Sequence, residues 1–128
     1  MPLARAMTGY TQVDACVDAF LNANAFKCLP DVPPSPFLAL GQMAMLVSYH
    51  EGRVEATPGI DRVRELRSCC ASSLEDAISV GDRLEKTVDM FGLIGLCVLV
   101  HPDQEVLEAD LAAIRQMEQD GSLFVVSA

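Results

Sequence analysis

The chain is poor in basic residues and lacks any apolar run long enough to cross a membrane. Only nine Lys and Arg stand against 18 Asp and Glu, which gives a net charge of −9 over 128 residues. Nucleic acids and anionic lipid surfaces bind to basic patches, so we expect no direct nucleic-acid binding and no membrane binding. The longest apolar stretch, residues 90–100, has 11 residues, whereas a membrane-spanning helix needs about 20.

Motifs that hold metals or phosphate groups are also missing. The sequence has no CxxC or HxxxH pair and no glycine-rich phosphate loop, and its two histidines, His50 and His101, stand alone. Cys97 and His101 would meet on a helix, but a thiol within the most apolar run is better explained as buried and inert. We therefore expect no catalytic residue, no metal, no cofactor and no enzyme activity.

The cysteines are odd in number and have no disulfide-scaffold spacing; they are Cys16, Cys28, Cys69, Cys70 and Cys97. The first residues do not form a basic stretch followed by an apolar signal core, so we expect a cytoplasmic protein. The adjacent thiols of Cys69 and Cys70 could form a redox pair. Buried packing is favoured instead, because successive side chains on a helix diverge by about 100°.

About half of the chain is apolar (51%), and a chain of this size buries only roughly two-thirds of its unfolded surface. We predict a single all-α domain over residues 1–128, a small helical bundle of four to five helices. Residues 1–10 are expected to be mobile. Residues 122–128 are expected to form a tail, either a short strand or an extended arm.

The helical periods divide the chain at its prolines and glycines. The apolar spacing predicts a helix over 11–26, with Thr11 and Asp14 as an approximate capping box. Residues 27–36 contain four prolines and form a connector. Further helices are predicted over 36–49, from Pro58 through Ile78, and over 103–120, where Gly121 ends the last one. A helical period also continues from residue 84 to 91.

The segment over residues 36–49 is apolar on nearly every side if it is a helix. A helix of that kind must be covered all round, either as the central core helix or by a second chain. If one side is exposed, we expect it to bind a homodimer mate or a target protein. The candidate partner-binding residues on this segment are Phe37, Leu40, Met43, Met45, Leu46 and Val47.

Residues 54–78 have the sequence VEATPGIDRVRELRSCCASSLEDAI, a Pro-Gly-Ile helix opening followed by small residues and leucines. This stretch, after a proline-rich connector, resembles the QslA-like quorum-sensing anti-activators of pseudomonads. The resemblance implies a protein that binds a LuxR-type transcription activator, blocks its dimerisation and so prevents DNA binding. The alternative, consistent with the same acidic composition, is a chaperone or assembly factor for a secretion or phage system.

Overall fold

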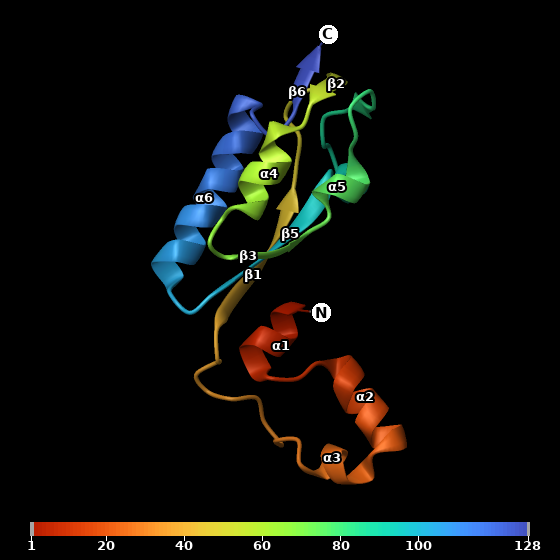
Figure 1. The fold of residues 1–128 in the computed structure, drawn as a ribbon, viewed down its shortest axis with the longest axis vertical. Helices are drawn as coiled ribbons and strands as arrows, with labels where there is room; N and C mark the ends of the chain where they lie inside the picture. The colour runs from red at the N-terminus through yellow and green to blue at the C-terminus, as the bar shows by residue number, and fades with distance from the viewer. Residues whose placement is uncertain (1, 128) are drawn as a thin grey trace.

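The computed structural model describes residues 2–127 and shows a mixed α/β fold (Figure 1). The helices are α1 (Pro2–Thr8), α2 (Gln12–Leu21), α3 (Ala23–Lys27), α4 (Pro58–Arg64), α5 (Leu74–Ala77), the short 3₁₀ helix η1 (Met90–Gly92) and α6 (Gln104–Asp120). The strands are β1 (Leu40–Leu46), β2 (Gly52–Ala56), β3 (Cys69–Ser72), β4 (Arg83–Leu84), β5 (Gly95–His101) and β6 (Val125–Ser127). The prediction of an all-α bundle of four to five helices is therefore wrong.

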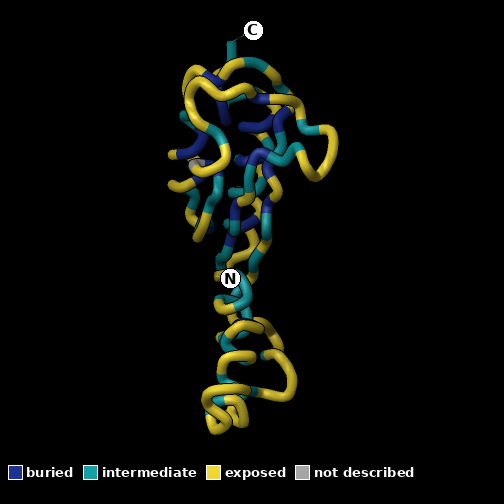
Figure 2. The backbone as a smooth tube through the Cα atoms, turned by 90° about the vertical axis from the view of Figure 1, so that its right-hand side faces the viewer, coloured by how far each residue is buried: buried dark blue, intermediate teal, exposed yellow. Residues whose placement is uncertain are grey.

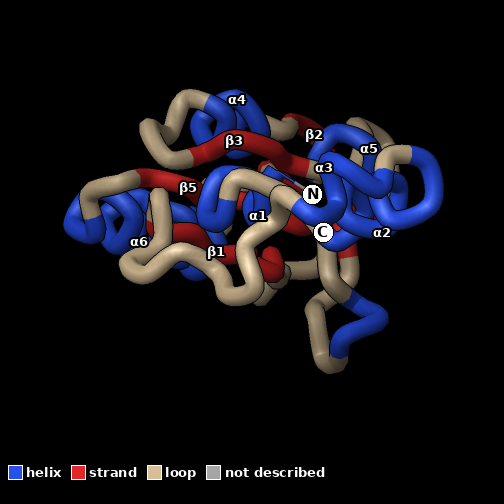
Figure 3. The backbone as a smooth tube through the Cα atoms, turned by 90° about the horizontal axis from the view of Figure 1, so that it is seen from below, coloured by secondary structure: helices blue, strands red, loops and turns tan. Residues whose placement is uncertain are grey.

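The strands form two antiparallel sheets of three strands each. The first sheet has the order β1-β5-β3, and the second has the order β4-β2-β6. Figure 3 shows the strands of the first sheet side by side, with β5 in the middle. Helix α6 packs against β1 and β5, and α4 packs next to β3, so both helices contribute to the core beside this sheet (Figure 1).

Strand β1 replaces the helix predicted over residues 36–49. Ala44 and Leu46 are 1% and 0% exposed, whereas the alternate residues Met43 and Met45 point to the opposite face of the sheet. Both faces of β1 carry apolar residues, and such a run cannot be told from a buried helix by periodicity alone. The segment pairs with β5 at seven positions. This pairing stabilises the strand by more than the intrinsic preference of Leu and Met for a helix.

The first 27 residues fold differently from the rest. Residues 2–27, which we call the N-terminal arm, form α1, α2 and α3, and no residue of these three helices is buried (Figure 2). The predicted capping box is confirmed, because the Thr11 hydroxyl accepts the Asp14 N–H and the Asp14 carboxylate accepts the Thr11 N–H. Residues 2–8, which we expected to be mobile, form the helix α1, and their mobility stays a prediction; residue 1 lies outside the described residues.

The helix predicted from Pro58 begins where expected but ends at Arg64. Beyond it the buried Ser68 donates its N–H and its hydroxyl to the Asp110 carboxylate of α6, at 2.8 and 2.7 Å. This anchor turns the chain, and Cys69 then starts β3, which pairs with β5. The prediction that this helix continues through Ile78 is therefore wrong, and so is the helix predicted over residues 84–91.

The C-terminal predictions agree with the structure. Helix α6 covers Gln104–Asp120, and Gly121 ends it in the left-handed conformation (φ 75°) that glycine adopts without steric cost. The tail contains the short strand β6, which pairs with β2; residue 128 lies outside the described residues. The connector is confirmed too, since residues 28–39 form neither helix nor strand.

One cluster of buried apolar side chains forms the core between the sheets and helices α4 and α6. All 15 of its members lie at or after Ala44, and each large one contributes roughly 1.5–3 kcal/mol by leaving water. The largest fully buried ones are Leu46, Leu74, Leu99, Ile114, Val54 and Val63. The N-terminal arm therefore adds helices to the fold without adding to its core.

Candidate protein-docking surface

The first sheet presents an apolar face on the side away from the core. In the β1–β5 register Gly41, Met43 and Met45 lie opposite Val100, Val98 and Leu96. Opposite residues of an antiparallel pair share one face. The alternate residues Ala44 and Leu46 of β1, and Cys97 and Leu99 of β5, are buried on the other face. We call the six residues Gly41, Met43, Met45, Leu96, Val98 and Val100 the outer sheet face.

Helix α1 covers one end of the outer sheet face and leaves the other open. A Cβ at Gly41 would overlap the Leu3 side chain and lie 3.4 Å from the Met7 sulfur, so α1 rests directly on this glycine. At the other end Met45 and Leu96 are 47% and 37% exposed. The open end is therefore an apolar surface of methionine and aliphatic groups, which adapts well to a partner.

A second apolar surface lies on α2. Val13, Val17, Phe20 and Leu21 have the i, i+4, i+7, i+8 spacing of one helix face, and we call them the α2 apolar face. All four are exposed; Phe20 and Leu21 reach 89% and 83%. In Figure 1 the arm extends from the first sheet beyond α1, so helix α2 lies away from the core.

The sequence-predicted partner residues divide among three environments. Phe37 and Leu40 are exposed just before and at the start of β1, and Met43 and Met45 lie on the outer sheet face. Leu46 is fully buried in the core, and Val47 is half-buried after the strand. Sequence reasoning missed the β5 half of this face, because no local pattern links it to β1. It did identify the helical period of α2, but did not predict that this apolar face is exposed.

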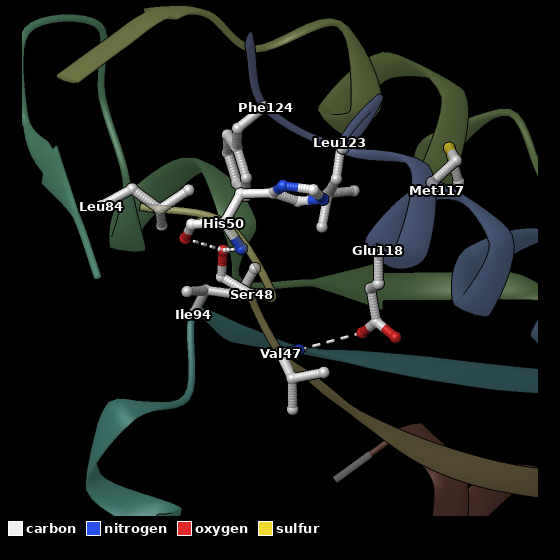
Figure 4. A pocket seen from close by; sticks show the side chains of 10 residues that line it. Val47, Ser48, His50, Leu84, Ile94, Met117, Glu118, Leu123 and Phe124 are labelled. Carbon is white, nitrogen blue, oxygen red and sulfur yellow. Dashed lines mark hydrogen bonds between the residues drawn. The ribbon is translucent and has the colours of Figure 1, made fainter. Parts of the chain in front are cut away.

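The C-terminal end of β1 is held by α6. The Glu118 carboxylate, 0% exposed, accepts the Val47 N–H at 2.9 Å (Figure 4). It also pairs with the Arg115 guanidinium at 2.8 Å. Arg115 also donates to the Met45 carbonyl at 3.0 Å. A buried carboxylate is tolerated only when its acceptor positions are filled in this way. These bonds fix the backbone that carries Met45.

The cavity shown in Figure 4 is too small for an organic ligand. It holds about 10 Å³, the space of about one water molecule. Ser48 and His50 line it, but the Ser48 hydroxyl donates to the His50 backbone carbonyl at 2.7 Å, while the His50 ring contacts the Gln119 carbonyl. The imidazole is thus not placed as a base for the hydroxyl.

The cysteines and histidines do not form a metal centre within the described residues, where no group of three or more ligating side chains comes together. Cys97 and His101 lie on strand β5 and not on a helix; burial raises the pKa of Cys97 to about 12, with Cys69 adding to the effect. His101 instead accepts the Asp103 N–H at 3.0 Å. Over residues 2–127 we find no helix with the length and apolar character that a bilayer crossing requires.

No protein-family model and no curated protein matches the chain. Among solved structures, it is similar to the L-amino acid ligase from Bacillus licheniformis, with a TM-score of 0.55 and 14% sequence identity. The match covers 99% of this chain but only 29% of the ligase chain. The likeness shows a shared α/β fold, in a chain that spans less than a third of the ligase's length.

Proposed function

We propose that this chain is a docking module that packs onto the body of an enzyme of the L-amino acid ligase kind. The outer sheet face and the α2 apolar face are its contact surfaces. The observation that carries the proposal is the exposure of a complete amphipathic helix face on α2, together with the open end of the sheet at Met45 and Leu96.

The free energy of removing apolar side chains from water favours a state in which a partner covers both surfaces. Removing one large apolar side chain from water contributes roughly 1.5–3 kcal/mol, and the α2 apolar face alone holds four such residues. Contiguous exposed apolar patches on soluble domains mark interaction sites. The net charge of −9 disfavours self-association of two copies, because like charges repel, and favours a partner with a basic rim around the contact.

The ligase likeness supports the choice of partner. It extends over 99% of the chain, so the arm and the sheets together have a counterpart in the ligase. The ligase holds this unit within a chain more than three times as long (29% of it is matched). A body of that kind provides the surface against which the unit is covered, whether it belongs to a second polypeptide or to the same one.

The partner implied by the resemblance, a LuxR-type transcription activator, stays a prediction, as does the chaperone alternative. Both would use an apolar surface of the same type, and neither has a structural observation that favours it over the ligase body. The expected homodimer and the cytoplasmic location also stay predictions.

The test compares three single variants of the tagged chain in captures from its own cells. Met45→Glu and Val17→Asp place a charge in the two contact surfaces, and each should weaken capture of an amino-acid-ligating enzyme at least tenfold, or about 1.4 kcal/mol. Val80→Asp is the matched control, because Val80 is 64% exposed in the loop before β4. Its capture should equal that of the unchanged chain.

The captured protein must be identified by mass spectrometry and assayed for amino acid ligation. A LuxR-type regulator in its place would refute the ligase proposal and support the resemblance. Capture that Met45→Glu and Val17→Asp leave intact would show that neither surface docks. Far-ultraviolet circular dichroism on each variant checks that the fold is retained.

A further inference from the structure

Two cysteine side chains from adjacent strands are in contact inside the first sheet. The sulfur atoms of Cys69 on β3 and Cys97 on β5 lie 3.6 Å apart. Cys97 is fully buried in the core and Cys69 is half-buried beside it. A disulfide bond is about 2.05 Å long, so the two sulfurs need to approach by roughly 1.5 Å to be joined.

A β-bulge lies next to this contact. The β3–β5 register shifts between Cys69 and Ala71, so Cys70 is the extra residue of the edge strand. A bulge re-aims the neighbouring side chains; here Cys69 reaches the core side, whereas Cys70 is exposed. The structure thus places Cys69 against Cys97, across 28 residues of sequence. The sequence alone raised only Cys69 and Cys70 as a redox pair, and favoured buried packing for them.

We infer that Cys69 and Cys97 are a modification site, at which hydrogen peroxide converts the thiol pair into a reversible cross-strand disulfide. The peroxide oxidises the Cys69 thiol to a sulfenic acid and is reduced to water. The Cys97 sulfur then bonds to the Cys69 sulfur and displaces the hydroxyl group, which leaves with the Cys97 proton as a second water. In sum, two thiols and one peroxide give one disulfide and two waters.

The order of the two steps follows from exposure. Cys69 is the thiol that solvent reaches, while Cys97 is enclosed in the core. Burial keeps Cys97 protonated, with a pKa raised to about 12, so it is a poor first target for an oxidant and serves as the resolving thiol. Contact with Cys69 compensates for this low reactivity, because the second step is intramolecular.

The disulfide would join the edge strand β3 to the central strand β5. β3 has only four residues and pairs on one side alone, so its hydrogen bonds open more easily than those of β5. Both sulfurs lie on the core side of the sheet. Oxidation therefore leaves the outer sheet face unchanged, and this inference does not depend on the proposed docking function.

The test counts thiols in the full chain before and after treatment with hydrogen peroxide. Alkylation with N-ethylmaleimide under denaturing conditions should label five cysteines in the reduced protein, and three after oxidation, with a linked peptide that joins Cys69 to Cys97. Dithiothreitol should restore both lost labels, and β3 amides should exchange hydrogen more slowly in the oxidised form. The matched control Cys70→Ser should fall from four labels to two and keep the linked peptide. Cys97→Ala, which has no resolving thiol, should lose only the Cys69 label, from four to three, and give no peptide linked through Cys69.

A linked peptide that contains Cys70, or that joins Cys16 to Cys28, with Cys69 and Cys97 still free, would overturn the inference. So would irreversible over-oxidation of Cys69 while Cys97 keeps its label. The linked peptide is mapped in the unsubstituted chain, so the inference stays testable even if Cys97→Ala fails to fold.

Discussion

Replacing Glu118 with alanine should destabilise the fold more than any single surface change. Glu118 is 2% exposed, and its carboxylate accepts both the Val47 N–H and the Arg115 guanidinium. Alanine leaves the Val47 N–H without an acceptor, at a cost of about 1–3 kcal/mol. Loss of a fully buried ion-pair partner costs about 3–5 kcal/mol, but the Arg115 side chain is 41% exposed and regains water, so this contribution is much smaller.

We therefore expect Glu118→Ala to lower the free energy of unfolding by about 3 kcal/mol and the Tm by about 10 °C. Glu118→Gln keeps an oxygen acceptor for the Val47 N–H and loses only the charge, so it should cost about 1 kcal/mol. Glu108→Ala is the control, because Glu108 is exposed on the same helix and should change stability by less than about 0.5 kcal/mol.

Urea titration followed by circular dichroism, with thermal melts alongside, measures these differences. The reasoning fails if Glu118→Ala is as stable as Glu108→Ala. It also fails if Glu118→Gln is as damaging as Glu118→Ala, because the charge and not the backbone bond would then be the important contribution. A changed denaturant slope would indicate that the native state, and not only its stability, has been altered.

Two further predictions concern the N-terminal arm. Gly41→Val should displace α1, because the new side chain overlaps Leu3; limited proteolysis should then cut within residues 2–27 faster, while Gly92→Ala, which has room for a methyl group, leaves the cutting rate unchanged. Bonds to Thr11, aided by Arg5, hold the pKa of Asp14 below its usual 3.8, so the cap of α2 is complete above that pH and is lost as the pH falls through the lowered value. The Thr11 amide resonance should report this titration, and its absence in the unchanged chain would refute the assignment.

The sequence signals that proved reliable were those that act within one turn of chain. Thr11 and Asp14 mark the start of α2, and Gly121 marks the end of α6, because capping bonds and positive φ angles depend on nearest neighbours. The strands depend on pairing between residues about 50 positions apart, as between Ala44 and Cys97, and a helical period can arise in such a run by chance. The β-branched Val98 and Val100, between Gly95 and Pro102, were the available signal for β5.

The sequence predicted part of the outer sheet face, the part that lies within residues 36–49. Residues 36–49 contain too many apolar side chains to lie on a single buried face. This holds whether the segment is a helix or a strand, so some of these side chains must lie on a second face. In the strand the surplus falls on alternate residues, so Met45 is exposed whereas Leu46 is in the core. The sequence could not assign individual residues to the surface. Side chains repeat every 2 residues in a strand and every 3.6 in a helix, so the choice between the two determines which residues face the core.

The stability of the N-terminal arm points to one continuous partner surface. Helices of 10 residues such as α2 are marginal in water and take their stability from packing of an apolar face, yet no residue of α1, α2 or α3 is buried. Helix α1 rests on the outer sheet face at Gly41 and leads directly into α2. Met45 and Leu96 lie at the opposite end of this face from Gly41. A single body that covers these two residues must therefore continue along the outer sheet face and past α1 to supply the packing that α2 lacks.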